Sequence, residues 1–301
     1  MSQNLKSASQ SAHDKLKGSL YLTIAASIWG GMFVVVKIVV PSVPPMILVW
    51  SRYLIAIIAL VLFCLQQKVD WHIAKRDWPL LIGIGLIGQL ASIVFQETGT
   101  MLANAQIGSI VTATTPAFMT LFAAWLLREK LSWQQLLAVT SATTGVVLAG
   151  GGFHVKPQQL LGVGSLTIAA LTWALMSVLL KKVPARYPAL QVTTVGTAVA
   201  LIGLTPMIFI GYPHFNWAVL TTPKVGAGIL YLGIISTAVA FVLWNKGLQY
   251  LRASQSGLFF FFQPLVGSLL GWLVLGEALH VSFVVGCLLI FAGVGLTLRE
   301  P

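Results

Sequence analysis

The sequence predicts an all-α membrane protein in which ten transmembrane helices form two inverted five-helix repeats around a central cavity. Three observations lead to this fold class. Hydrophobic residues make up 57% of the 301 residues and charged residues only 8%, which excludes an ordinary soluble domain. The apolar residues gather in runs long enough to cross a bilayer. One half of the chain can also be aligned with the other half.

The internal repeat is visible without gaps. Residues 104–131 align on residues 252–279 at a shift of 148 (252 − 104), and an upstream segment aligns at a shift of 144. The matched pairs are Pro116/Pro264, Glu129/Glu277, Gly99/Gly247, Trp29/Trp173 and Lys37/Lys181. A duplicated membrane half is typical of transporters, which hold the substrate site between the halves.

The spans follow from the apolar runs, which have the length of about 20 residues that a spanning helix needs. In order, they are 18–40, 46–66, 78–97, 103–127, 132–150, 160–181, 189–211, 225–246, 253–275 and 280–298. We divide the chain into a polar tail (1–17), a first repeat (18–150), a linker (151–159) and a second repeat (160–298). The run from Gly18 is too long for a cleavable signal peptide, so we expect it to stay as an anchor.

The basic residues predict the orientation. Of the 18 Lys and Arg, two lie within spans (Lys37 and Arg52) and two in outer loops (Lys156 and Lys224). The rest are cytoplasmic if the amino terminus is inside, so we expect both termini in the cytoplasm. The net charge of +11 therefore reflects topology, and no nucleic acid partner is expected. Five spans per half is an odd number, so the repeats are inverted and suited to alternating access.

Three charged residues lie within the predicted spans or at their outer ends: Lys37, Arg52 and Glu97. Arg52 lies about 10 Å of helix inside the outer end of the second span, and a cation there usually faces a cavity or a partner. It could snorkel to the headgroups or form a cationic outer vestibule with Lys37 that contacts an anionic substrate. Glu97 is a partner for either cation. If Glu97 neutralises Arg52, the pair is a gate or a structural clamp.

Aromatic and uncharged polar residues complete the predicted cavity. Trp29 and Trp173 are too deep for interfacial tryptophans and could stack on a solute, or pack against other helices. Gln89, Gln263 and Thr112 are further candidates for substrate binding, because a polar group in a dry interior needs a partner. The prolines of the fourth and ninth spans are predicted to bend those helices, either as packing kinks or as cavity walls; they are Pro116 and Pro264.

The sequence offers little for chemical catalysis. It has no P-loop, no cluster of metal ligands and no nucleophile beside a base, so we expect no enzyme activity, no cofactor and no metal. Cys64 and Cys287 fall within apolar runs and are read as packing residues. No span carries a central Asp or Glu, which favours facilitated transport, or a coupling that the sequence does not reveal, over a buried proton relay.

The repeated pattern resembles the EamA family of the drug/metabolite transporter superfamily. The matching stretches are WGGMFVVVK at 29–37, SRY at 51–53, residues 98–132, TPKVGAGILYLG at 222–233 and residues 247–280. The resemblance implies ten helices, cytoplasmic termini, a central cavity and outward movement of small metabolites, commonly amino acids. It also implies that the corners at 129–131 and 277–279 cap the fourth and ninth helices. The small drug exporters of this superfamily use a glutamate in the first helix, and residues 18–40 contain none.

The sequence therefore predicts a bacterial-type inner (plasma) membrane permease that exports amino acids or related compounds by alternating access. Its partners are a small-molecule substrate and the lipid bilayer, and assembly as a homo-oligomer stays open. Two alternatives remain. One is an antiporter of phosphorylated or sugar-linked solutes that uses Arg52 and Lys37 as anion clamps. The other is a membrane sensor or scaffold that transports nothing.

Overall fold

The computed structural model describes residues 2–103, 114–130 and 159–275, with isolated positions between 108 and 144. Within these ranges the regular structure is entirely helical. The elements of the first half are α1 (Ser2–Val39), α2 (Pro45–Gln66), η1 (Lys75–Asp77), α3 (Trp78–Gly83), η2 (Ile84–Ser92), α4 (Ile93–Leu102) and α6 (Thr115–Leu127). Those of the second half are α8 (Leu160–Leu180), α9 (Ala189–Gly211), η4 (Trp217–Thr221), α10 (Pro223–Leu230), η5 (Tyr231–Val239), α11 (Ala240–Tyr250), α12 (Ala253–Gly257), η6 (Leu258–Phe261) and α13 (Phe262–Leu275).

Seven helices in the described part of the chain are long and apolar enough to cross a membrane. They are 14–39, 45–66, 75–102, 160–180, 189–211, 223–250 and 253–274. The prediction of ten spans is thus only partly confirmed. The predicted fourth span (103–127) is described mainly through α6, and the predicted spans 132–150 and 280–298 lie outside the continuous described ranges.

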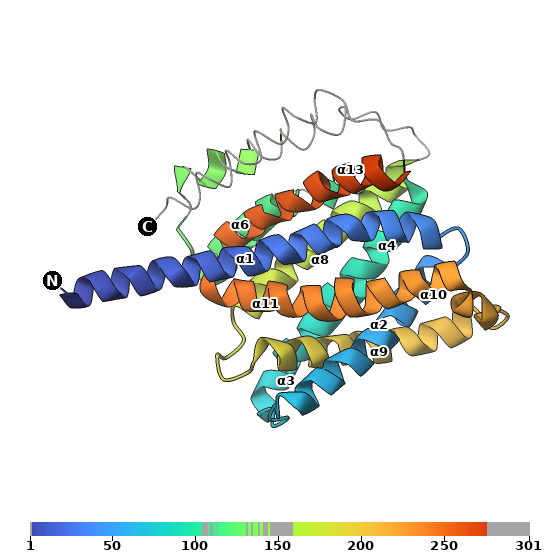
Figure 1. Ribbon diagram of the computed structural model, residues 1–301, viewed down its shortest axis with the longest axis horizontal. Coiled ribbons are helices and arrows are strands. Elements are labelled where there is room, and N and C mark those ends of the chain that lie inside the picture. Colours follow the sequence, from blue (N-terminus) through green and yellow to red (C-terminus); the bar gives the residue numbers. More distant parts are fainter. Residues whose placement is uncertain are drawn as a thin grey trace.

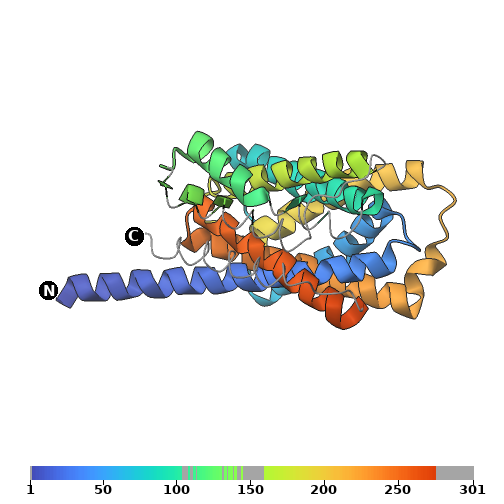
Figure 2. The same cartoon turned by 90° about the horizontal axis from the view of Figure 1, so that it is seen from above.

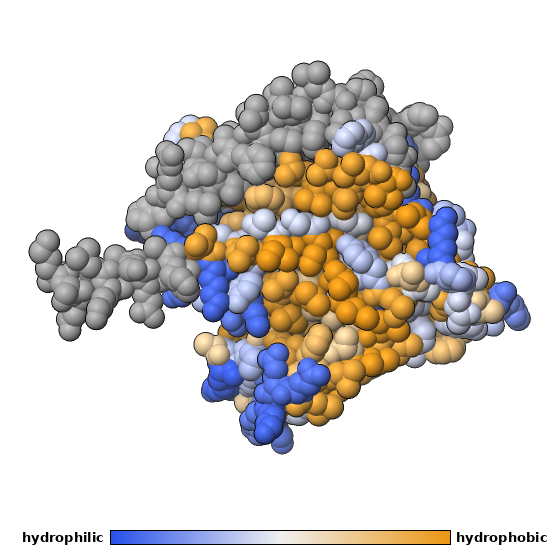
Figure 3. Space-filling model, in the orientation of Figure 1, coloured by the Kyte–Doolittle hydropathy of each residue, from blue (hydrophilic) through white to orange (hydrophobic). Residues whose placement is uncertain are grey.

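The surface has the polarity of a membrane protein. Figure 3 shows a broad hydrophobic belt, with hydrophilic residues at the two ends of the helices. Large apolar side chains are exposed on the surface, such as Ile210 at 81% and Leu161 at 78%. A soluble protein rarely exposes a continuous apolar surface of this extent, so lipid is the natural neighbour of these side chains.

Helix α1 runs the length of the bundle and projects beyond it (Figures 1 and 2), so the segment predicted as a tail continues the first helix. We call the end from which α1 projects the tail end. Lys17 lies over the ring of Tyr250 there, 5.7 Å from its centre. The loops at 40–44 and 212–222 lie at the opposite end.

Local sequence sets the helix ends. Pro45 and Pro223 stand in the first turns of α2 and α10, where a proline's missing N–H leaves no helical bond unmade. Helix α6 ends at Leu127 because Arg128 adopts the left-handed conformation, with φ of 55°. Such a residue stops the helical ladder at its carboxyl end.

The two halves interlock through repeat-related glycines. Gly99 of α4 packs against Gly162 of α8, and Gly247 of α11 packs against Gly18 of α1. A Cβ built on Gly162 would lie 3.0 Å from the Gly99 carbonyl oxygen, and one on Gly247 would lie 3.1 Å from the Gly18 oxygen. Gly18 and Gly162 are 144 residues apart (162 − 18) and Gly99 and Gly247 are 148 apart (247 − 99). The same contact therefore occurs twice, each time between opposite halves.

A second repeated feature is a π-helical segment in the third and the eighth predicted spans. These segments are η2 and η5, whose first residues are 147 positions apart (231 − 84). Segment η2 packs against α8 and α9, whereas η5 packs against α2 and α11. π-Helical turns are rare in proteins, and those that occur are often found at functional sites. The side chains around these two segments are therefore candidates for a functional site.

Candidate functional site

A buried polar network centres on Arg52 of α2. The side chain is 0% exposed, and its Nη1 forms an ion pair of 3.0 Å with the Glu97 carboxylate of α4, which is 2% exposed. Arg52 Nε donates to Thr237 Oγ1 at 2.9 Å, and Nη2 donates to Ser236 Oγ at 3.2 Å. Both acceptors belong to η5. The charge is therefore neutralised inside the protein and ties the second span to the π-helical segment of the other half.

This geometry answers the question that the sequence left open about Arg52. The guanidinium does not snorkel to the headgroups, because it is fully buried and each of its three nitrogens donates to the protein, including contacts of 3.5 Å to Met32 Sδ. A buried cation requires such compensation. Arg52 and Glu97 thus form a buried ion pair that joins α2 to α4.

A central cavity lies beside this ion pair and is lined by both halves. Its volume is about 20 Å³, which is room for about one water molecule. Its lining residues are Trp29, Met32, Arg52, Ile93, Gln96, Thr112, Thr115, Ala169, Ala170, Trp173, Phe241, Phe260 and Gln263. The walls are mostly apolar, and the polar groups are amides, hydroxyls and the paired Arg52. A solute could enter only if these walls moved apart.

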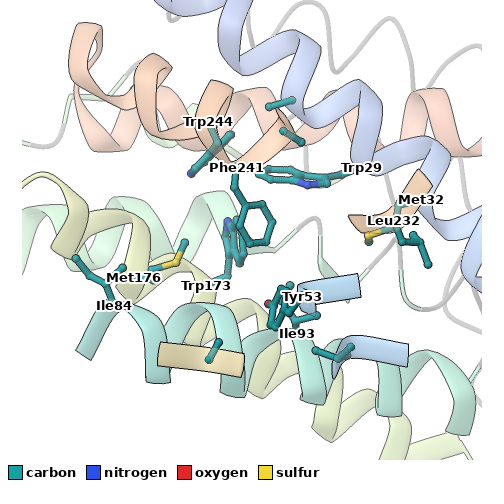
Figure 4. Packing of buried hydrophobic residues seen from close by; sticks show 14 of the residues in the cluster. Trp29, Met32, Tyr53, Ile84, Ile93, Trp173, Met176, Leu232, Phe241 and Trp244 are labelled. Carbon is teal, nitrogen blue, oxygen red and sulfur yellow. The ribbon is translucent and has the colours of Figure 1, made fainter. Parts of the chain in front are cut away.

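Four aromatic side chains line the cavity: Trp29, Trp173, Phe241 and Phe260. Figure 4 shows Trp29, Trp173 and Phe241 packed against one another. The rings of Trp29 and Trp173 meet edge to face, with centroids 5.2 Å apart. Trp29 also stacks on Phe260 at 5.6 Å, and Trp173 contacts Phe241 at 5.3 Å. The two tryptophans that the repeat relates are therefore in direct contact at the interface of the two halves.

The two indole N–H groups differ in their partners. Trp29 Nε1 donates to the backbone oxygen of Ser236 at 2.9 Å. Trp173 Nε1 is buried and finds no acceptor among the described residues, and its side chain lines the cavity and is 6% exposed. A buried donor without an acceptor costs free energy, so this N–H marks a place where a ligand acceptor would be stabilised.

The structure brings together five of the seven residues predicted to bind substrate: Trp29, Arg52, Thr112, Trp173 and Gln263 all line the central cavity. It does not bring Gln89 or Lys37 there. Gln89 Oε1 accepts from Thr197 Oγ1 at 2.8 Å, so this amide is used between η2 and α9. Lys37 is exposed near the end of α1. It therefore lies outside the lining of the central cavity.

The two repeat-related prolines each follow an interruption in their span. Pro116 is the second residue of α6, after a turn at Thr114. Pro264 is the third residue of α13, which follows the tight turns of η6. Because a proline cannot continue the hydrogen bonding of the preceding turn, each stands where the α-helix restarts. Both breaks adjoin the cavity, since Thr115 and Gln263 precede the prolines and line it.

Several residues of the cavity are not among those predicted to bind substrate. Phe241 and Phe260 belong to its aromatic wall, and Met32, Gln96 and Thr115 line it elsewhere. Phe260 belongs to the run of four phenylalanines at 259–262, directly before the predicted proline bend. That position was the available signal for Phe260, whereas Phe241 and Met32 look like ordinary apolar residues of their spans.

Carboxylates join the two halves at the tail end. Glu129 accepts from the backbone N–H of Ala253 at 3.1 Å and from Ser254 Oγ at 2.7 Å. Its side chain therefore caps the start of α12 in the second half. Its backbone N–H donates to the Ala123 oxygen at 3.2 Å and so also caps the end of α6, as the family resemblance implied for the fourth helix. The corresponding Glu277 lies outside the described residues. Asp77 accepts from Tyr187 Oη at 2.7 Å and also pairs with Arg186.

Comparisons with known proteins agree with this architecture. The sequence profile of the "EamA-like transporter family" matches residues 16–151 and 160–299. A solved crystal structure of a protein that is 21% identical matches with a TM-score of 0.77, covering 93% of this chain and 95% of that one. At this identity it shows the fold alone.

Relatives of similar length are named as transporters. An "uncharacterized transporter" of Archaeoglobus fulgidus is 23% identical over 95% of this chain and 100% of its own. The "probable terminal-alkyne amino-acid exporter" of Streptantibioticus cattleyicolor is 27% identical over 94% of this chain and 93% of its own. The "probable amino-acid metabolite efflux pump" of Salmonella typhimurium is 25% identical over 92% and 93%, respectively.

Proposed function

Because the chain belongs to the EamA-like transporter family, and is thus a multi-pass membrane transporter, we propose that it exports amino acids or related small carboxylates. Export would occur by alternating access across a bacterial plasma membrane. The repeated glycine contacts and the paired π-helical segments support this mechanism, because inverted halves can open a shared site to each side in turn. Both termini would then lie in the cytoplasm, as the distribution of Lys and Arg predicts.

The observation that carries the proposed substrate class is the indole N–H of Trp173. It is buried, lacks an acceptor among the described residues and lines the central cavity, which the side-chain amide of Gln263 also lines. A carboxylate oxygen accepts from such donors more strongly than a neutral oxygen does. The aromatic wall of Trp29, Phe241 and Phe260 would contact an apolar side chain of the same solute.

The relatives favour the same class. Two of them, with full-length similarity, bear names that include amino-acid export or efflux. Their identities of 27% and 25% leave room for a different substrate. The proposal therefore rests on the cavity, and the names only agree with it.

The structure favours this class over phosphorylated solutes. That alternative needed Arg52 and Lys37 as a pair of anion clamps. Arg52 is instead neutralised by Glu97, and Lys37 does not line the cavity. A doubly charged phosphate would meet no uncompensated cation among the described residues of the central cavity. In this proposal Arg52 and Glu97 clamp the second span to η5 and do not touch the substrate.

Counterflow in proteoliposomes tests the proposed function. Proteoliposomes that contain the purified protein are loaded with unlabelled leucine, phenylalanine, threonine, a sugar or a sugar phosphate. Uptake of the same radiolabelled solute is then followed. We expect saturable exchange of an amino acid. Exchange of sugar phosphates alone would replace the proposed substrate class. Absence of all exchange together with measurable solute binding would favour a sensor.

Trp173→Phe tests the observation that carries the proposal. The change keeps an aromatic ring but removes the N–H, and a hydrogen bond to a charged group contributes about 1.5–3 kcal/mol. We expect KM for the exchanged amino acid to rise about tenfold or more. Trp272→Phe, on the exposed face of α13, is the matched control and should leave KM unchanged. An unaltered KM in Trp173→Phe would remove the N–H from substrate recognition.

A further inference from the structure

A second cavity opens at the tail end and is much larger than the central one. Its volume is about 290 Å³, close to the lower limit of pockets that hold small ligands, about 300 Å³. It lies between the end of α8, the start of α9 and the end of α11. We call it the tail-end cavity; its lining residues are Leu180, Lys181, Val183, Pro184, Ala185, Tyr187, Ala189, Val192, Asn245, Leu248 and Gln249.

Lys181 places a positive charge on the wall of this cavity. Its Nζ donates to the backbone oxygens of Leu248 at 2.6 Å and Leu251 at 2.8 Å. These neutral groups hold the ammonium in place but do not cancel its charge. No carboxylate among the described residues forms an ion pair with it. Burial lowers the pKa of Lys181, which lies just beyond α8, and the charge of Glu129 opposes this shift.

The tail-end cavity is aligned with the central cavity along α11. Phe241 lines the central cavity and Leu248 lines the tail-end cavity, and seven residues of helix span about 10 Å. Trp244 lies between them and is 0% exposed. Its ring contacts Phe260 at 4.6 Å and Trp29 at 5.3 Å, and its Nε1 donates to Ser177 Oγ at 3.3 Å. A single aromatic side chain thus stands between the two cavities on this helix.

The repeat supplies an independent observation. Lys181 corresponds to Lys37 at a shift of 144 (181 − 37). Lys37 lies near the end of α1 opposite to the tail end, and Lys181 lies at the tail end. In an inverted repeat, equivalent residues stand toward opposite sides of the membrane. The duplicated architecture therefore places a lysine toward each side, and Lys181 is the one at the tail end.

We propose that the tail-end cavity is a cytoplasmic capture site, in which Lys181 attracts the carboxylate of the exported solute before it passes Trp244 to the central cavity. This inference rests on the proposed function and adds a second binding site to it. Val183, Val192 and Leu248 would contact the apolar part of the solute. Asn245 is held by a hydrogen bond of 2.7 Å from its Nδ2 to Thr193 Oγ1, so its amide is already oriented on the cavity wall.

Side-specific kinetics test the capture site. The amino acid of the counterflow panel that exchanges fastest is supplied to inside-out and to right-side-out vesicles of phosphatidylcholine. Lys181→Gln keeps an N–H donor for the two carbonyls but removes the charge. We expect KM to rise about two- to fivefold from the cytoplasmic side, the range for a partly exposed charge pair, and to stay unchanged from the outside. Lys181→Arg should restore the wild-type KM.

Lys182→Gln is the matched control, because it removes the same charge one residue away, where the side chain is exposed and does not line the cavity. An equal rise of KM in Lys182→Gln, an equal rise on both sides of the membrane, or no rise in Lys181→Gln would overturn the capture site. A rise of KM in Lys181→Gln that appears only after anionic lipid is added to the vesicles would assign the cavity to a lipid headgroup. That result would also overturn the capture site. If the wild-type protein exchanges nothing, the proposed function fails before these variants are compared.

A thiol in the cavity gives a readout that does not depend on the fold of Lys181→Gln. Gln249→Cys is introduced after Cys64→Ala and Cys287→Ala, and a membrane-impermeant thiol reagent is applied from the cytoplasmic side. We expect the transported amino acid to slow labelling of Gln249→Cys severalfold and to leave the labelling of Lys182→Cys unchanged. Equal labelling rates of Gln249→Cys with and without the solute would contradict the proposal.

Discussion

At the scale of single residues, we expect the largest electrostatic effect on stability from the Arg52–Glu97 ion pair. Both side chains are buried, and their 3.0 Å contact joins α2 to α4 while Arg52 also bonds to η5. Removing one partner of a buried pair leaves an uncompensated charge, which costs about 3–5 kcal/mol. Replacing both partners by apolar residues avoids that cost.

A double-mutant cycle measures this coupling. We expect Arg52→Met and Glu97→Met each to lower the free energy of unfolding in mixed micelles by about 3–5 kcal/mol. The double variant should lose clearly less than the sum of the single losses. Additive losses would show that the two charges are stabilised independently, and the clamp would then be wrong.

Residue identity alone predicted part of the cavity. Trp29, Trp173, Arg52, Thr112 and Gln263 could be found because each is polar or aromatic in an apolar span, and the two tryptophans also occur as a repeated pair. Gln89 met the same criterion but faces Thr197. It lies in the π-helical η2, whose wider turn shifts the face on which each side chain stands. Ordinary helical periodicity could not predict that shift.

At the scale of helices, close backbone contact at glycine holds the halves together. A Cβ on Gly162 of α8 would lie 2.7 Å from the backbone nitrogen of Ala103 and 3.0 Å from the oxygen of Gly99. Backbone atoms cannot move aside as a flexible side chain can. The contact between α4 and α8 therefore depends on the absence of a side chain at this position.

Gly162→Ala tests this contact against a control in the same helix. We expect the substitution to lower the free energy of unfolding by about 1–3 kcal/mol, the usual cost of overpacking. Gly164→Ala, two residues along α8, meets nothing within 4 Å. That control should be neutral or up to about 1 kcal/mol more stable, because alanine favours helix. Equal stability of the two variants would contradict close packing at Gly162.

At the end of α6 we expect a substitution that stabilises the protein. Arg128 has φ of 55°, and the left-handed conformation costs a non-glycine residue about 1–2 kcal/mol. We expect Arg128→Gly to raise the free energy of unfolding by about 1 kcal/mol, since glycine adopts this conformation without strain. Lys130→Gly, at a position without positive φ, should not stabilise. A less stable Arg128→Gly would show that the side chain contributes more than its backbone strain costs.

Helix boundaries were predictable where apolar runs end at proline or charge. The predicted spans 46–66 and 189–211 agree with α2 and α9 to within one residue. Two features could not be read from hydropathy. The third and eighth spans contain π-helical segments, and the ninth contains the 3₁₀ turns of η6. Hydropathy reports how apolar a span is, whereas these local departures depend on contacts with helices distant in sequence.

At the scale of the whole molecule, the described halves are interlocked rather than side by side. Helix α1 packs mainly on α11 and α13, and α4 packs on α8, so helices of each half contact the other half. The central cavity is closed to about 20 Å³, whereas the tail-end cavity holds about 290 Å³. We infer that transport requires the aromatic wall around Trp29 and Trp173 to separate.

The repeat and the charge distribution predicted the class of molecule, because both are properties of the linear chain. Duplicated residues such as Trp29 and Trp173 also indicated which parts would meet. The closure of the central cavity could not be predicted in this way, because it depends on how aromatic rings from four helices pack in one space. Nor did hydropathy predict the tail-end cavity, whose Lys181 has the same sequence context as the exposed Lys182 beside it.

The central claim is that one cavity opens alternately to the two sides of the membrane, and thiol accessibility at position 263 tests it most directly. Gln263→Cys is introduced together with Cys64→Ala and Cys287→Ala, and an impermeant thiol reagent is applied from each side in turn. Ile202→Cys, on the exposed apolar face of α9, is the control and should stay unlabelled. Alternating access predicts that Gln263→Cys is labelled from either side and that the transported amino acid slows both reactions. Labelling from one side only, whether or not the amino acid is present, would contradict the claim.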